Sequence, residues 1–180
     1  MLFVRLFLGA TAIGVGILTL GYLQTDHAPL PTVDSVDLTR YVGNWYEIAL
    51  LPNRFQKACI ADTQANYTVN GEIIRVRNRC RNADGDLEEA RGIAKVVERS
   101  GNAKLRVSFF RPFYGDYWIL ALDPDYRWVL IGEPSRKYGW ILSRSPTLDE
   151  LTVQRLLDKA ESLGYNRSTF RRSLQSHPLD

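Results

Sequence analysis

Between residues 44 and 144 the chain repeats one pattern, in which a short apolar or alternating segment is followed by a cluster of turn-forming residues. The clearest turn signals are Asn70-Gly71, Ser100-Gly101-Asn102 and Asp123-Pro124-Asp125. They permit the backbone angles of tight hairpin turns. An antiparallel meander leaves two unpaired edges unless it closes on itself. The sequence therefore predicts an all-β fold, an eight-stranded antiparallel up-and-down β-barrel.

The first expected strand lies in "YVGNWYEIALLP", residues 41–52, and Trp45 indicates which of its side chains point into the barrel. If Trp45 points inward, alternation sends Glu47, Ala49 and Leu51 inward with it. A carboxylate at Glu47 would then need a polar partner such as Arg or Tyr. The remaining strands are expected at 59–69, 73–80, 86–98, 103–110, 116–123, 127–132 and 138–145.

One segment has a different period, "SPTLDELTVQRLLDKAESLGY", and predicts a helix over 147–163. Thr147 is expected as the N-cap, with Glu150 completing a capping box and Gly164 ending the helix. The helix is expected to cover the outside of the barrel against Tyr46 and Ile48. Its expected apolar face consists of Leu148, Leu151, Leu156, Ala160 and Leu163.

The chain contains two cysteines, Cys59 and Cys80. If the hairpin pairs Val69 with Glu72, the cysteines are two positions out of register, which a bulge or a longer loop would absorb. We expect a disulfide, which would close about 22 residues and stabilise the fold by roughly 3 kcal/mol. Two buried free thiols are the alternative.

The first 23 residues read as a targeting segment, because eighteen uncharged residues, 6–23, follow Arg5. Such a segment is either a cleaved signal peptide or an uncleaved N-terminal anchor, and both interpretations stay open. A linker is expected over 24–35, the barrel domain over 36–173 and a tail over 174–180. Without residues 1–23 the net charge falls from +3 to +2. This charge gives no electrostatic case for nucleic-acid binding.

The inward residues decide whether the barrel holds a ligand. On 103–110 the inward face is expected to be Leu105, Val107 and Phe109, with Lys104, Arg106 and Ser108 outside. Ala90, Gly92 and Ala94 share one face of their strand and leave volume for a ligand, unless larger neighbours fill it. The candidate ligand-binding residues are Phe55, Ala65, Tyr67, Val76, Val107, Phe109, Tyr117, Ile119 and Trp140.

Three short motifs make the chain similar to the lipocalin family: Gly43-Asn44-Trp45, Asp123 in "LALDPDY" and Arg144 in "WILSRSP". The resemblance runs from about Val36 to Phe170. "VSFFRPFYGDYWILALD" most resembles bacterial lipocalins of the Blc type, relatives of apolipoprotein D and the temperature-induced lipocalins. It implies that Trp45 plugs the barrel floor, that Arg144 lies on its ring, and that Gly43 lets the backbone approach closely.

The resemblance also implies a function: binding a fatty acid or lysophospholipid for lipid transport, storage or membrane maintenance in the cell envelope. A polar headgroup would stay at the rim near Arg54, Lys57 or Tyr114. We expect no cofactor, and a homodimer is possible. Bacterial members are typically lipoproteins, but no cysteine precedes Cys59, so lipid attachment is not carried over. The expected place is the periplasmic side of the envelope, either soluble or anchored by residues 1–23.

Two other classes remain as alternatives. An enzyme is disfavoured, because the only histidines, His27 and His177, lie outside the expected barrel and no nucleophile motif is recognisable. A metal site is disfavoured by the absence of ligand spacing. A structural envelope protein with a filled barrel is the second alternative. The basic run 166–173 could meet anionic headgroups, although a solvated tail is the favoured interpretation.

Overall fold

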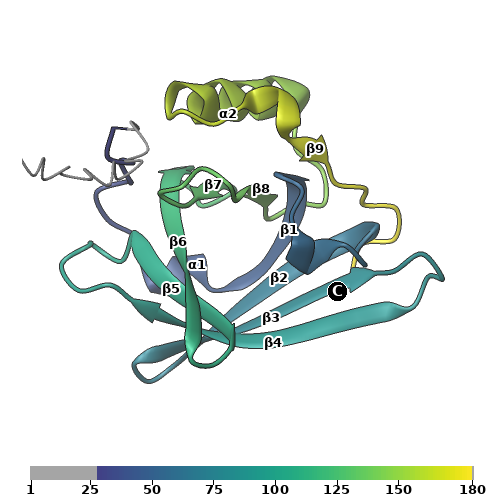
Figure 1. Ribbon diagram of the computed structural model, residues 1–180, viewed down its shortest axis with the longest axis horizontal. Helices are drawn as coiled ribbons and strands as arrows, with labels where there is room; N and C mark the ends of the chain where they lie inside the picture. The colour runs from purple at the N-terminus through teal and green to yellow at the C-terminus, as the bar shows by residue number, and fades with distance from the viewer. Residues whose placement is uncertain (1–27, 180) are drawn as a thin grey trace, which may run out of the picture.

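The computed structural model describes residues 28–179 and shows a closed antiparallel β-barrel with one long helix outside it (Figure 1). Eight strands follow one another around the barrel, and β1 pairs with both β2 and β8 to close it. The predicted fold is confirmed. The strands are β1 (Gly43–Leu50), β2 (Ala61–Asn70), β3 (Ile73–Arg81), β4 (Leu87–Val96), β5 (Lys104–Phe110), β6 (Phe113–Leu122), β7 (Trp128–Gly132) and β8 (Gly139–Ser143).

One long helix, three short helices and a ninth strand complete the described fold. They are α1 (Leu38–Tyr41), η1 (Arg54–Gln56), α2 (Glu150–Ser162), η2 (Arg167–Thr169) and β9 (Arg171–Arg172). We call the end of the barrel near α1 and the β6–β7 turn the floor. The opposite end, with the β1–β2 loop and the β5–β6 hairpin, is the mouth.

Two hydrophobic clusters divide the fold. The interior cluster includes Trp45, Val76 and Ile119, and the outer cluster joins the barrel wall to Val153 and Leu156 of α2. All the buried members of both clusters lie between residues 30 and 165. The eight barrel strands and α2 all lie within residues 43–162.

A bulge in β1 corrects the expected alternation. The pairing of β1 with β8 shifts between Glu47 and Ala49, so Ile48 and Ala49 both lie in the outer cluster. Leu51 lies there too, although alternation from Trp45 predicted that Ala49 and Leu51 point inward. The extra residue of a bulge breaks the period of two, and the sequence carries no local mark of it.

Helix α2 begins three residues later than predicted. Asp149, not Thr147, is the N-cap, and its carboxylate accepts a hydrogen bond from the backbone N of Thr152. Leu151 is 68% exposed, so its place on the predicted apolar face is also wrong. Thr152 and Val153 are buried instead. At about 100° per residue, Leu151 lies about 140° around the helix from the buried Leu156, whereas Thr152 and Val153 lie within about 60° of it.

The register of the β2–β3 hairpin differs from the predicted pairing of Val69 with Glu72, but the two cysteines still lie close together. Asn70 pairs with Ile73, and Val69 pairs with Ile74 rather than with Glu72. Between Ala61 and Gln64, toward the mouth, the register of β2 against β3 shifts. Cys59 and Cys80 form a disulfide with their Cα atoms 5.5 Å apart, so the predicted pairing is confirmed.

The segment after α2 is packed rather than a solvated tail. Arg171 and Arg172 pair with β1 as strand β9, and the ring of Phe170 packs on the outer cluster. Farther along, the carbonyl of Leu179 accepts hydrogen bonds from the side chains of Gln64 and Tyr46. The sequence had suggested that Tyr46 packs against the helix. Its hydroxyl instead donates to the C-terminal segment.

The predicted targeting segment, residues 1–23, lies outside the described residues, and so do residues 24–27 of the predicted linker. Within residues 28–179, no helix is both long enough and apolar enough to cross a bilayer.

Candidate functional site

The barrel floor is closed by a tryptophan and an arginine. Trp45 has no exposed surface, and the guanidinium carbon of Arg144 lies 3.9 Å from its ring centroid. A cation over an indole face in this geometry is attractive. The indole Nε1 of Trp45 donates to the carbonyl of Tyr41 at 2.8 Å. Arg144 donates to the carbonyls of Arg40, Tyr41 and Asn44.

Gly43 is required where β1 enters this floor. Its φ is +97°, a left-handed backbone angle that favours glycine. A Cβ at this position would lie 3.3 Å from a guanidinium nitrogen of Arg144. The contacts that the resemblance implied for Gly43, Trp45 and Arg144 are therefore all present.

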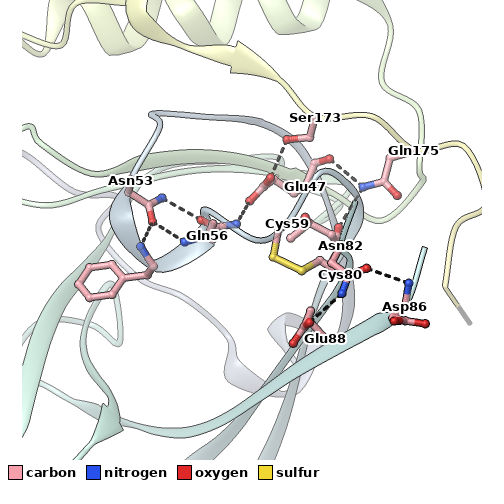
Figure 2. The surroundings of a disulfide bond; sticks show 12 residues. Glu47, Asn53, Gln56, Cys59, Cys80, Asn82, Asp86, Glu88, Ser173 and Gln175 are labelled. Carbon is pink, nitrogen blue, oxygen red and sulfur yellow. Dashed lines mark hydrogen bonds between the residues drawn. A yellow bond between two sulfur atoms is a disulfide. The ribbon is translucent and has the colours of Figure 1, made fainter. Parts of the chain in front are cut away.

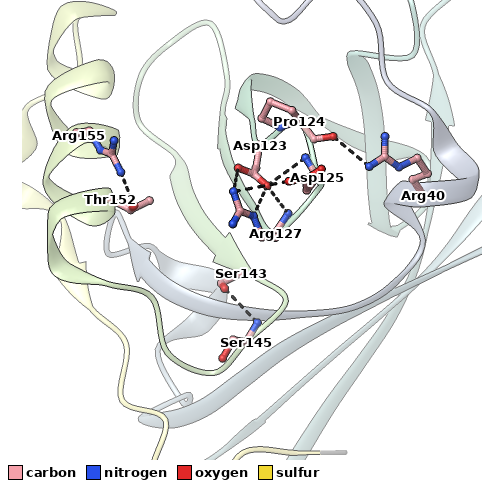
Figure 3. A network of polar contacts seen from close by, with 9 residues as sticks. All are labelled: Arg40, Asp123, Pro124, Asp125, Arg127, Ser143, Ser145, Thr152 and Arg155. Atoms are coloured by element: carbon pink, nitrogen blue, oxygen red, sulfur yellow. Dashed lines mark hydrogen bonds and ion pairs between the residues drawn. The ribbon is translucent and has the colours of Figure 1, made fainter.

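Asp123 organises the turn between β6 and β7 beside the floor (Figure 3). Its buried carboxylate accepts hydrogen bonds from the guanidinium of Arg127 and from the backbone nitrogens of Asp125 and Arg127. These bonds, first of all those from the Arg127 side chain, lower the pKa of Asp123. Arg40 of α1 donates to the carbonyl of Pro124, which ties α1 to this turn. Asp123 thus acts on the shape of the turn and not on the barrel interior.

Three tyrosine hydroxyls meet directly above the floor. The Tyr117 hydroxyl lies 2.7 Å from that of Tyr41 and 3.0 Å from that of Tyr67. Burial raises the pKa of all three phenols, that of Tyr67 to about 12, so they are neutral at physiological pH. Sequence reasoning included Tyr67 and Tyr117 but missed Tyr41, because Tyr41 precedes the first strand and shows no alternation.

The predicted ligand-binding residues fall into two groups. Seven of the nine belong to the interior cluster or pack against it, and the other two, Phe55 and Phe109, do not. The seven are Ala65, Tyr67, Val76, Val107, Tyr117, Ile119 and Trp140. They project into the barrel above the floor, a surface that is apolar apart from the Tyr67 and Tyr117 hydroxyls and the Trp140 indole nitrogen.

The expected alternation on β5 fails near the mouth. Ser108 is 4% exposed and Phe109 is 46% exposed, the reverse of their expected environments. The pairing of β5 with β6 shifts between Val107 and Phe110, which accounts for the reversal. The ring of Phe109 lies against Gly92, where an added Cβ would be 2.9 Å from a ring carbon. The volume that Gly92 was expected to leave open is therefore occupied by Phe109.

The side chain of Gln56 forms hydrogen bonds that connect the β1–β2 loop at the mouth to the barrel (Figure 2). Its carbonyl oxygen accepts from the side chains of Asn53 and Trp140, and its amide nitrogen donates to Glu47. Phe55, in the same loop, is 69% exposed and contacts the ring of Tyr138. Gln56 was missed by sequence analysis, since nothing local marks a glutamine as a hydrogen-bonding centre.

The polar residues expected at the rim do not converge on one point. Arg54 lies in η1 with its guanidinium 5.0 Å from the Phe55 ring centroid, and Lys57 follows η1 as an exposed side chain. Tyr114 is the second residue of β6, and its ring contacts the guanidinium of Arg106. Arg54 and Lys57 therefore share the β1–β2 loop, while Tyr114 belongs to the β5–β6 hairpin.

Glu47 is a buried carboxylate whose partners are neutral (Figure 2). It accepts from Gln56 at 2.7 Å and from the hydroxyl of Ser173 at 2.6 Å, rather than from the arginine or tyrosine that was expected. Burial raises its pKa, and the two hydrogen bonds offset only part of that effect.

Replacing Glu47 by glutamine should change how stability depends on pH. Because the pKa of Glu47 is raised on folding, the folded chain holds its proton more tightly than the unfolded chain. The associated stability is complete below about pH 4.5 and is lost as pH rises through the raised pKa. Glu47→Gln should remove this decline and be at least as stable as the wild type at pH 7. Urea unfolding at several pH values measures it, and an unchanged pH profile would contradict the assignment.

Comparisons with known proteins agree with this geometry. The family model described as "Lipocalin-like domain" matches residues 36–175. Temperature-induced lipocalin-1 of Arabidopsis thaliana is 40% identical over 162 residues, covering 85% of this chain and 87% of that protein. Outer membrane lipoprotein Blc of Escherichia coli is 39% identical over 140 residues, covering 77% and 78%. Insecticyanin of the tobacco hornworm superposes with a TM-score of 0.69 at 24% identity, covering 84% and 87%.

Proposed function

This chain belongs to the lipocalin family, and from that membership we propose that it holds a fatty acid or a lysophospholipid inside the barrel. Lipocalins bind small hydrophobic ligands, so the specific proposal concerns the ligand class. The observation that supports it best is the set of seven largely apolar side chains above a floor sealed by Trp45.

The chemistry of this lining suits an acyl chain. Burial of each methylene contributes about 0.8 kcal/mol, so a long chain gains on the order of 10 kcal/mol before ordering and association costs are subtracted. The three tyrosines carry no charge at physiological pH, so an apolar end can approach them without displacing an ion. A carboxylate or phosphate headgroup would remain at the mouth, near Arg54 and Lys57.

The proposed place is the periplasmic side of a cell envelope, in lipid transport, storage or membrane maintenance. Its support is the similarity to a protein described as an outer membrane lipoprotein, together with the uncharged segment 6–23. In this proposal residues 1–23 either anchor the chain in the membrane or are removed as a signal peptide, which would release the chain into the periplasm.

Lipid extraction tests the proposal directly. Residues 24–180 contain the complete barrel and can be purified from cells, extracted with organic solvent and examined by mass spectrometry. A fatty acid or lysophospholipid in stoichiometric amount is the expected result. A lipid-free protein whose tryptophan fluorescence also stays unchanged on titration with lysophospholipids would contradict it.

A substitution at Phe55 tests the ligand site without disturbing the fold. Phe55→Ala removes a 69% exposed ring at the mouth, so we expect unchanged stability and a several-fold weaker affinity for lysophospholipid. Leu151→Ala is the matched control, because Leu151 is 68% exposed on α2, outside the barrel. Fluorescence titration measures both variants. Equal affinities would remove Phe55 from the ligand site.

A structural protein with a filled barrel is the second candidate. One observation favours it: the ring of Phe109 already occupies the space beside Gly92. The extraction and titration experiment separates the two functions, since a filled barrel retains and binds no lipid.

A further inference from the structure

The outer face of β3 carries a row of four arginines, Arg75, Arg77, Arg79 and Arg81. Ile74 and Val76 of the same strand are buried in the interior cluster, so the alternate positions face outward. At about 3.3 Å per residue the row extends roughly 20 Å along the barrel wall.

Neighbouring strands add positive charge to the same face. The register sets Arg77 opposite Arg91 of β4, and Lys95 of β4 opposite Arg106 of β5. Like charges directly opposite each other destabilise a sheet. We call these seven residues the basic face: Arg75, Arg77, Arg79, Arg81, Arg91, Lys95 and Arg106.

Acidic residues neutralise only part of the basic face. Arg91 pairs with Glu89, which also lies opposite Arg79, and Arg81 pairs with the buried Asp62. Asp116 of β6 lies opposite Arg106. Within residues 28–179, Arg75 and Arg77 form no ion pair. The basic face thus keeps an excess of positive charge.

The basic run 166–173 is different, although the sequence had made it the candidate for anionic headgroups. Arg167 pairs with Asp158 and lies near Glu161, and Arg172 pairs with Glu150. The acidic residues of α2 therefore offset two of the three arginines in this run.

An exposed aromatic pair adjoins the basic face at the mouth. Phe110 and Phe113 are 75% and 71% exposed, and their rings stack with centroids 6.2 Å apart at the tip of the β5–β6 hairpin. Arg91, Phe109 and Arg111 line one pocket of about 240 Å³, which joins this hairpin to β4. Exposed rings beside cations are typical of protein segments that enter the interfacial layer of a membrane.

We propose that the basic face docks the barrel on an anionic lipid bilayer, with Phe110 and Phe113 inserted between headgroups. The arginines and Lys95 bind lipid phosphates, since each basic residue near an anionic surface contributes about 1 kcal/mol. An acidic protein would match the charges but would not account for the aromatic tip. Docking brings the mouth to the lipid surface and is independent of what the barrel holds.

Vesicle sedimentation with residues 24–180 tests this docking without the hydrophobic segment 1–23. We expect the protein to sediment with vesicles that contain phosphatidylglycerol and not with pure phosphatidylcholine. Binding should weaken as salt rises from about 0.1 M to about 1 M, because screening shortens the Debye length.

Two variants separate binding from folding. Arg77→Gln with Arg91→Gln should reduce partitioning about fivefold per residue, roughly 25-fold together. It should leave thermal stability nearly unchanged, because a like-charge pair and the exposed Arg91–Glu89 ion pair are lost together. Phe110→Ser with Phe113→Ser should also reduce binding. The control is Arg155→Gln with Lys159→Gln, which removes the same charge from α2, across the molecule from β3 and β4 (Figure 1).

Several results would overturn the proposal. They are equal binding to neutral and anionic vesicles, no binding to either, an equal loss in the α2 control, and full binding by the arginine variant. Binding to heparin or DNA without vesicle binding would assign the basic face to a different anionic partner.

Discussion

Trp45→Ala is expected to lower the free energy of unfolding by about 3–5 kcal/mol, the cost of truncating a fully buried aromatic side chain. Trp45 has no exposed surface and contacts Tyr41 within the interior cluster. Its loss would also leave the Arg144 guanidinium without the ring on which it lies. Urea denaturation followed by far-UV circular dichroism measures the change.

The matched variant for Trp45 is Trp45→Phe. Phenylalanine keeps a ring beneath Arg144 but loses the indole nitrogen that donates to the Tyr41 carbonyl. We therefore expect a smaller cost than for alanine. If Trp45→Ala unfolded at nearly the wild-type urea concentration, the floor would not depend on this residue.

Removing the disulfide is expected to cost about 3 kcal/mol, because the reduced unfolded chain regains the freedom of a loop of this length. The bond joins residues 21 positions apart and connects the β1–β2 loop to the end of β3. Cys59→Ala with Cys80→Ala should lower the urea midpoint, and a reducing agent should lower the wild-type midpoint similarly.

The double variant supplies the control for reduction. Without cysteines, its midpoint should not change when reductant is added. A wild-type midpoint that is also insensitive to a reductant shown to cleave the bond would mean that the disulfide adds little stability. The loop would then depend mainly on Gln56 and its hydrogen bonds.

Most of the fold could be predicted from local pattern. Turn residues and alternation indicated eight strands, and helical spacing indicated one helix. The resemblance to the lipocalin family implied that Arg144 lies on Trp45 beside Gly43. The strands and the helix depend on neighbouring residues, and the floor contact is a recurrent packing arrangement of the family. These features can therefore be predicted without the whole structure. The boundaries were less certain, as Thr147 shows: a second capping residue, Asp149, lay two positions away and formed the cap.

The errors in the candidate site have one physical origin. Alternation predicts the side of a strand only while the period of two continues, and register shifts at Ile48 and between Val107 and Phe110 interrupt it. Closing a barrel places such irregularities, and closure is a property of all eight strands together. Phe109 was therefore assigned to the interior, although its side chain is 46% exposed and its ring lies against Gly92.

The sequence by itself determined the strand order and the cysteine pair, because periodicity and turn chemistry encode them locally, and its resemblance to the lipocalin family implied the closed floor. Only the tertiary structure decided that Glu47 meets Ser173, 126 residues away, and that Tyr41 meets Tyr117, 76 residues away. It also decided that Arg77 faces Arg91. Polar partners and surface charge patterns arise where distant segments are brought together, and no local period records which segments those are.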